Sequence, residues 1–170
     1  VTLGVGIITN TSQAVNITGT NNTSTITTAT PGSDLYVFVN QGTTSIGAKL
    51  TGNMNLVKSG GATLTLNNPT AVGSNDFTGG TFVQQGTLNL TAGSAGIVLI
   101  PGDLTINNAT VTMNTNAGQI ASTSNIFING GGVLNMTGTN TLASVSFNNQ
   151  GGTGNPTLAA STSLTLSATN

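Results

Sequence analysis

Short segments with alternating apolar and polar residues recur along this chain at an interval of about two dozen residues. Four of them are TLTL at 63–66, TLNL at 87–90, TVTM at 110–113 and VLNM at 133–136, so their starts are 24, 23 and 23 residues apart. Alternation with a period of two predicts β-strands with one buried and one solvated face. A strand of this length cannot bury its apolar face alone, so successive copies are predicted to stack around a shared core.

Stacking in register predicts columns of like side chains on each side of the strand. The inward columns would hold Leu64, Leu66, Leu88, Leu90, Val111, Met113, Leu134 and Met136, and the outward ones Thr63, Thr65, Thr87, Asn89, Thr110, Thr112, Val133 and Asn135. Regular hydroxyl rows on a flat face are also used by ice-binding β-helices. The other interpretation is that Thr is a favoured uncharged polar residue for a strand exterior.

A second strand precedes each of these segments across a turn rich in Gly or Asn, residues that accept positive φ. These partner strands are NLV at 55–57, TFV at 81–83, DLTI at 103–106 and IFI at 126–128. We interpret each unit as a short strand pair. A later unit begins with SVSFN at 144–148 and continues through an enlarged loop to SLTL at 163–166, which we take as the next copy, offset by about 30 residues.

Residues 1–45 fit the period poorly, although segments 1–8, 14–18, 24–28 and 35–39 resemble strands. We divide the chain into 1–45, degenerate N-terminal coils or an assembly segment, and 46–170, regular β-helix repeats. Residues 1–9 either add to another copy by strand addition or form the first coil of an interrupted array. The start without Met and the uncapped ends suggest a fragment of a longer array.

The fold predicted from these observations is all-β, a parallel β-helix of about seven coils of 20–24 residues each. Thr, Asn, Gly and Ser dominate the polar positions, a composition rich in strand and turn formers and poor in helix formers. The main alternative is a two-layer β-sandwich, in which the same strands would form antiparallel hairpins.

Charged residues are rare, and this limits the chemistry that the chain supports. Arg, Glu, His, Cys and Trp are absent, so most groups used for acid–base, nucleophilic or metal chemistry are missing. We therefore expect no enzyme activity, no catalytic residue, no cofactor and no metal site. The net charge of -1 offers no basic patch for nucleic acid. No apolar run approaches the roughly 20 residues that span a bilayer, so we expect no membrane insertion of this segment.

The three aspartates and Lys58 are the charged side chains with a candidate role. Asp76 and Asp103 lie 27 residues apart, about one coil plus a few residues, so they could approach each other on neighbouring turns as the acid residues of β-helical polysaccharide hydrolases do. The alternative is that both lie in turns, where an Asp side chain bonds its own backbone. Whether these two or Asp34 bind an ion stays open. We expect Lys58 to play a structural role, with its stem on apolar surface and its amine in water. Of the few aromatic residues, Phe38 and Phe147 are expected to be internal, which disfavours glycan binding.

Three consecutive motifs, LVKSGGATLTLNN, DFTGGTFV and QQGTLNL, resemble the passenger-associated β-strand repeat of bacterial autotransporters. The resemblance covers 46–91 well, with a looser copy from Gly131. It implies a β-helix exported to the bacterial cell surface or beyond it. The leading hypothesis is a non-catalytic structural or adhesin module, a rigid rod whose partners are neighbouring repeats, copies of itself end to end, and a host or neighbouring cell surface. The alternatives are a self-assembling fibre subunit and a carbohydrate-binding or carbohydrate-cleaving β-helix.

Overall fold

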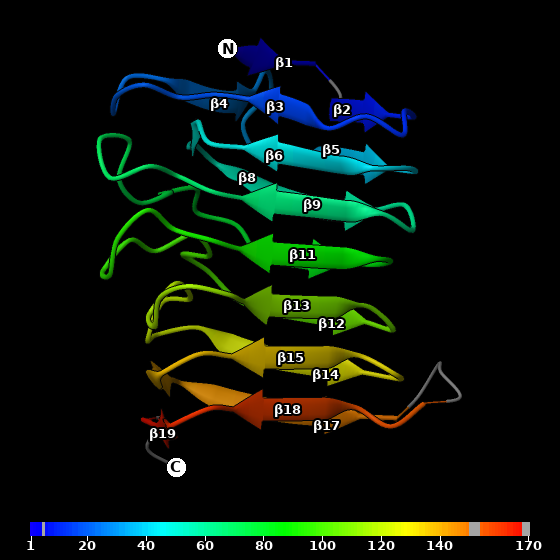
Figure 1. Cartoon of the computed structure of the whole chain (residues 1–170), viewed down its shortest axis with the longest axis vertical. Coiled ribbons are helices and arrows are strands. Elements are labelled where there is room, and N and C mark those ends of the chain that lie inside the picture. Colours follow the sequence, from blue (N-terminus) through cyan, green and yellow to red (C-terminus); the bar gives the residue numbers. More distant parts are fainter. Residues whose placement is uncertain (5, 150–153, 168–170) are drawn as a thin grey trace.

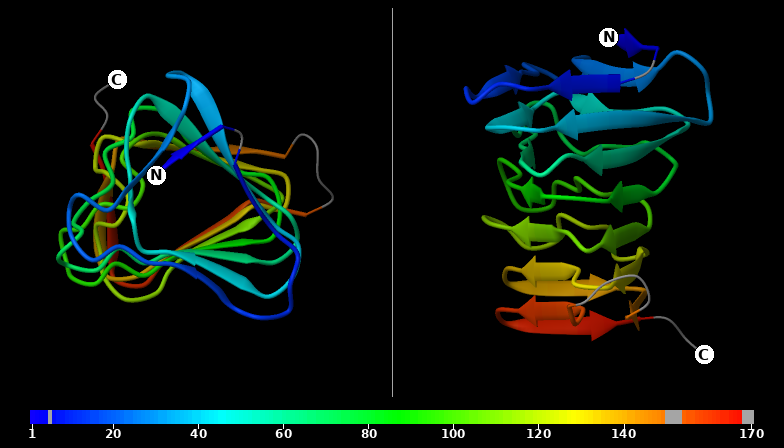
Figure 2. Two further views of the ribbon diagram at one scale, coloured as in Figure 1. Left: turned by 90° about the horizontal axis from the view of Figure 1, so that it is seen from above. Right: turned by 90° about the vertical axis from the view of Figure 1, so that its right-hand side faces the viewer.

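The computed structural model describes residues 1–4, 6–149 and 154–167, and these residues form a parallel β-solenoid of about seven turns without any helix (Figure 1). Viewed along its axis, the solenoid is a three-sided ring, and the first and last strands of the chain lie at opposite ends of the stack (Figure 2). The prediction of an all-β parallel β-helix is confirmed. Within the described residues no helix could span a membrane, because there is no helix at all.

Two sides of the ring are seven-stranded parallel sheets. Sheet I consists of β2 (Gly6–Thr9), β5 (Ser33–Val39), β8 (Met54–Ser59), β10 (Thr81–Val83), β12 (Leu104–Asn107), β14 (Asn125–Asn129) and β17 (Ser144–Asn148). Sheet II, which faces the viewer in Figure 1, consists of β3 (Val15–Ile17), β6 (Thr43–Ile46), β9 (Thr63–Leu66), β11 (Thr87–Leu90), β13 (Thr110–Met113), β15 (Val133–Met136) and β18 (Thr157–Ala160).

The third side of the ring is less regular. It contains a three-stranded sheet of β1 (Thr2–Leu3), β4 (Thr25–Thr28) and β7 (Lys49–Leu50), and a two-stranded sheet of β16 (Thr139–Leu142) and β19 (Ser163–Leu166). Between these small sheets the chain runs in loops, with an isolated bridge from Ile100 to Ile120. Each coil therefore passes through sheet I, sheet II and the third side in that order.

The four periodic segments coincide with β9, β11, β13 and β15, and their register gives the predicted offsets. Thr87 pairs with Thr63 on one side and with Thr110 on the other, and Thr110 pairs with Val133. Every strand pairing in the described part of the chain is parallel. This excludes the antiparallel β-sandwich. All eight predicted inward side chains of these strands are buried.

The two strands of one unit do not pair with each other, contrary to our interpretation of strand pairs. They belong to different sheets, and the glycine-rich segment between them is a corner of the ring. Gly60 and Gly86 occupy successive corners with φ of 80° and 71°. A Cβ on Gly60 would lie 2.3 Å from the Val39 carbonyl oxygen of the previous coil, so the corner needs glycine for both conformation and space.

The assignment of SLTL as the next copy of TLTL is wrong. The strand that pairs with β15 is β18, at an offset of 24 residues, whereas SLTL is β19 and pairs with β16 on the third side. The preceding strand of sheet I, β17, follows β14 by only 19 residues. The corner between β17 and β18 contains more residues than the corner between β14 and β15, and these extra residues bring β18 into register with β15. Part of this enlarged loop lies outside the described residues.

In the N-terminal part, β2 and β5 join sheet I and β3 and β6 join sheet II, so residues of this part wind around the same axis as the later repeats. The offsets are larger here: Ile7 pairs with Val37, and Ile17 with Ile46. β1 pairs with β4 on the third side. Thr9 turns inward, where its hydroxyl shares a 2.7 Å hydrogen bond with the Thr44 hydroxyl.

Candidate functional site

The two aspartates considered as an acid pair have separate structural roles. Asp76 forms a 2.7 Å salt bridge with Lys49 on the third side. Partial burial opposes ionisation of Asp76, but hydrogen bonds from Lys49 and Thr51 outweigh it and lower the pKa of this carboxyl. Asp103 instead accepts hydrogen bonds from the backbone N–H and the side-chain amide of Asn125, at 2.8 and 3.1 Å. Each carboxylate therefore bonds to a residue of a neighbouring coil, and the two aspartates do not share a bonding partner.

Asp34 is also engaged. Its carboxylate accepts hydrogen bonds from the Tyr36 hydroxyl at 2.9 Å and the Asn55 amide at 2.8 Å. The bond to the carboxylate and its negative charge raise the pKa of Tyr36. Among the described residues, no three His, Cys, Asp or Glu side chains are close enough together to hold a metal ion.

The expectation that the Lys58 amine lies in water is wrong. Lys58 has no exposed surface, and its Nζ donates hydrogen bonds to the carbonyl oxygens of Ser59, Gly60 and Gln85 at 2.9, 2.7 and 2.9 Å. The lysine thus ties its own corner to the corner of the next coil. Burial lowers the pKa of Lys58 from 10.5 to about 8.

Buried amide side chains hold the irregular third side together, a feature that the sequence analysis did not identify. The Oδ1 atom of Asn75 accepts hydrogen bonds from Leu50 N and Asn68 Nδ2, and its Nδ2 donates to Leu99 O. Asn75 therefore joins three successive coils where no strand ladder does so. Gln119, in a later loop, joins its own coil to the preceding one, because its Oε1 accepts a 2.7 Å bond from Ala92 N and its Nε2 donates to Asn116 O. Sequence periodicity gives no signal for such residues, since they lie in the loops.

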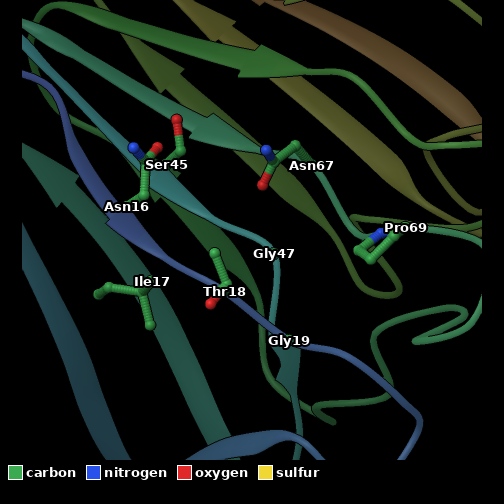
Figure 3. A pocket seen from close by; sticks show the side chains of 8 residues that line it. All are labelled: Asn16, Ile17, Thr18, Gly19, Ser45, Gly47, Asn67 and Pro69. Carbon is green, nitrogen blue, oxygen red and sulfur yellow. The ribbon is translucent and has the colours of Figure 1, made fainter.

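A small pocket opens beside the N-terminal coils of sheet II (Figure 3). Its volume is about 170 Å³, and it is lined by Asn16, Ile17, Thr18, Gly19, Ser45, Gly47, Asn67 and Pro69. A Cβ on Gly19 would lie 2.6 Å from the Gly47 carbonyl oxygen, so these glycines allow the coils to approach closely here. The volume is below the range of about 300 to 1,000 Å³ that is usual for ligand pockets. The shape of this pocket follows from the close packing of neighbouring coils at Gly19 and Gly47.

The outer face of sheet II carries the predicted polar rows. One row, in register order, is Thr43, Thr63, Thr87, Thr110, Val133 and Thr157; the other is Asn16, Ser45, Thr65, Asn89, Thr112, Asn135 and Ala159. Hydroxyls are continuous over four coils in the first row, but the second row mixes hydroxyl, amide and methyl groups. This face has no aromatic side chain.

The outer face of sheet I carries aromatic residues instead. Its central row is Gly6, Tyr36, Val57, Phe82, Thr105, Phe127 and Ser146 in register order. A large ring therefore stands on every second coil from β5 to β14, with a smaller side chain between successive rings. Tyr36 is 47% exposed and Phe127 39%, while Phe82 is partly exposed. Figure 1 shows that this sheet lies behind sheet II, on a different side of the ring.

The expectation that Phe38 and Phe147 are internal is wrong for both residues. Phe38 points outward and is 38% exposed, beside the central row of sheet I. Phe147 pairs with Ile128 in an inward column, but it lies on the edge strand β17 and is 57% exposed. The number of aromatic side chains available on the outside is therefore larger than the sequence suggested.

Two rows of hydrogen-bonded polar side chains flank the central row of sheet I. On one side, Asn55 Nδ2 donates to Asp34, and the Ser144 hydroxyl donates to Asn125 Oδ1 at 2.7 Å. On the other side, Asn107 Nδ2 donates to Gln84 Oε1 at 2.8 Å and Asn129 Nδ2 donates to Asn107 Oδ1 at 2.7 Å. These bonds run along the axis from coil to coil and hold the polar rows in place.

A groove of about 440 Å³ lies between two of the rings. Tyr36 and Phe82 form its ends and Val57 its floor, while Asp34, Asn55 and Gln84 supply polar groups at its sides. A second hollow, of about 360 Å³, adjoins the other side of Tyr36. Grooves with an apolar floor and a few fixed polar groups are typical of ligand sites. This face is therefore the candidate binding surface of the molecule.

Comparison with protein-family models matches residues 56–90 to the passenger-associated-transport-repeat, which confirms the resemblance noted in the sequence. The match spans 35 of the 170 residues and runs from within β8 to the end of β11. No curated protein and no solved structure matches the chain. The chain is thus a β-solenoid that contains an autotransporter passenger-type repeat, and this repeat implies a surface or secreted protein.

Proposed function

We propose that this chain is a non-catalytic structural module of a bacterial surface protein, a stiff β-helical rod that takes part in adhesion. The main support is the pair of seven-stranded parallel sheets whose strands share continuous inner columns. In such a stack each inner strand has both edges paired, so opening a coil requires breaking two ladders and exposing buried apolar surface. A rod of this kind suits display outside the cell, where proteases are present.

The roles of the three aspartates support the absence of catalysis. Asp34, Asp76 and Asp103 each bond to a different residue of a neighbouring coil. An acid pair for glycoside hydrolysis needs two carboxyl groups facing one bond, with one of them held protonated. The pKa of Asp76 is lowered, which is the wrong direction for a general acid.

The test compares intact bacteria that carry the native gene with a strain in which residues 46–149 are deleted in frame. We expect antibodies against the chain to label intact cells, and the deletion to reduce adhesion or cell aggregation severalfold. The control strain lacks only residues 87–109, one register-matched coil, because Gly86 then joins Thr110, the partner of Thr87. It should keep most of the adhesion. Labelling of permeabilised cells only, or release of sugars from polysaccharides by the purified chain, would overturn the proposal.

A further inference from the structure

We infer that the outer face of sheet I binds a neutral, extended polysaccharide, with Tyr36, Phe82 and Phe127 as stacking platforms and the flanking polar rows as hydrogen-bonding groups. This goes beyond the proposed structural role, which does not require any particular ligand. The rod supplies the flat, rigid surface, and the binding residues lie on its strands rather than on its loops.

The three rings do not stabilise one another. Adjacent strands are about 4.8 Å apart, so rings on every second coil are separated by about 9.6 Å, beyond the 4.5–7 Å range of aromatic pairs. All three are also partly exposed to solvent. Their burial therefore contributes little to the core. The smaller side chains of Val57 and Thr105 stand between successive rings in the row and leave open surface there.

The ring of Phe82 lies along the face rather than pointing straight out. Its Cε2 atom is 3.3 Å from where a Cβ on Gly80 would be, so the glycine leaves room for the ring to rest against the sheet. An aromatic ring in this position presents a flat apolar surface. The C–H faces of a pyranose ring are apolar while its hydroxyl groups point sideways, so a sugar stacked on the ring can bond to groups at the sides of the groove.

The flanking rows place such groups on both sides of the central row. Asn55 lies on one side of the groove and Gln84 on the other, and each amide carries both donor and acceptor atoms. Because the hydrogen bonds between coils fix these side chains, little conformational entropy is lost when they bind a ligand. The rings span four coil spacings, about 19 Å, so a chain of several sugars is needed to contact all three.

The charge of this face disfavours an anionic ligand. Asp34 and Asp103 lie in one flanking row, which has no cation to balance them. The two lysines of the chain are elsewhere: Lys49 pairs with Asp76 on the third side, and Lys58 is buried. Carboxylated or sulfated glycans and nucleic acids would meet like charges on this face, whereas a neutral polyol would not.

The test measures binding of cellohexaose, chitohexaose and the anionic hexagalacturonate to the full chain by isothermal titration calorimetry. We expect one of the neutral hexasaccharides to bind and hexagalacturonate not to bind. Phe82→Thr should weaken the binding about tenfold or more, since a central aromatic platform is lost. Thr87→Ala, on the outer face of sheet II in the same coil, is the matched control and should bind as the unaltered chain does.

Circular dichroism and thermal unfolding of both variants establish that the fold is kept. If Phe82→Thr does not fold, Gln84→Ala replaces it, with a smaller expected loss of affinity. The inference is overturned if no neutral hexasaccharide binds, if hexagalacturonate binds better, or if the sheet I and sheet II variants lose affinity equally. It is also overturned if Phe82→Thr abolishes a dimer of the chain without any effect on glycan, which would assign the face to a second copy. None of these outcomes affects the proposed structural role.

Discussion

The outer faces of the two long sheets differ, although the same alternation builds both. On sheet II the outward rows hold mainly Thr, Ser and Asn. On sheet I the central row holds Tyr36, Phe82 and Phe127, with polar side chains to each side. Inside the solenoid both sheets line one hydrophobic core.

This difference separates what the fold requires from what it merely permits. Sheet II shows that a row of small polar residues is sufficient for a stable exterior. The rings of sheet I are therefore not explained by the needs of the solenoid, and large exposed apolar side chains arranged in a row commonly mark binding surfaces. The aromatic face is where a function specific to this chain is to be sought.

The largest effect on stability is expected from exchanging apolar and polar residues between the inner and outer positions of one strand. Leu88→Asn on the inner side of β11 creates a cavity and buries an amide without partners, and should lower the free energy of unfolding by about 3 to 5 kcal/mol. Asn89→Leu, its outward neighbour, should change it by less than about 0.5 kcal/mol. Urea unfolding followed by circular dichroism measures both. Equal effects of the two variants would contradict the distinction between inner and outer positions.

A smaller effect on the free energy of unfolding is expected from a change of pH, through Lys58. This residue lies in an inner column of sheet I, and no described inner residue of sheet II is ionisable. The pKa of Lys58 is about 8 in the folded chain and near 10.5 in the unfolded chain. Between these values the folded chain has released a proton that the unfolded chain still holds. The free energy of unfolding should therefore rise as the pH increases from about 8, by at most about 1.4 kcal/mol per pH unit.

The control for this prediction is Lys58→Met, which removes the titrating amine and should abolish the rise. Stability is measured by urea unfolding between about pH 8 and pH 9, because the raised pKa of Tyr36 lowers the stability at higher pH, where the tyrosine of the unfolded chain ionises first. A stability that falls over this range, or a rise that persists in the variant, would show that the Lys58 amine is not destabilised in its charged form.

The smallest effect concerns the hydroxyl rows of sheet II, for which we expect no ice-binding activity. The second row mixes Thr65 with Asn89 and Asn135, and it ends at Ala159, so the hydroxyl groups do not form a two-dimensional lattice. Measurement of thermal hysteresis at high protein concentration should give a value indistinguishable from that of buffer. A clear hysteresis would move the functional surface from sheet I to sheet II.

The fold could be predicted from the sequence where apolar residues alternate with polar ones. In β9, β11, β13 and β15 only one of the two faces can be buried, so the register and the inward columns followed from the pattern. The passenger-type repeat was also visible, because its glycines and its strands occur together in one motif.

The inward side chains could not be predicted from the alternation where both faces of a strand are apolar. In LYVFV either Leu35, Val37 and Val39 or Tyr36 and Phe38 could face inward, and the structure buries the aliphatic set. SLTL matches TLTL in pattern, yet it lies on the third side because the chain had already completed the corner to β18. Local pattern does not reveal which side of the ring a strand occupies.

The sequence by itself determined that this protein is a stack of parallel coils, because a repeated amphipathic strand can bury its apolar face only against its own copies. The tertiary structure alone decided which residues meet on each outer face, since neighbours in a solenoid are separated by a full coil of sequence. It brought Tyr36, Phe82 and Phe127 into one row and placed the Lys58 amine among three carbonyl oxygens. These arrangements depend on the exact length of every corner and loop, and no local pattern encodes that length.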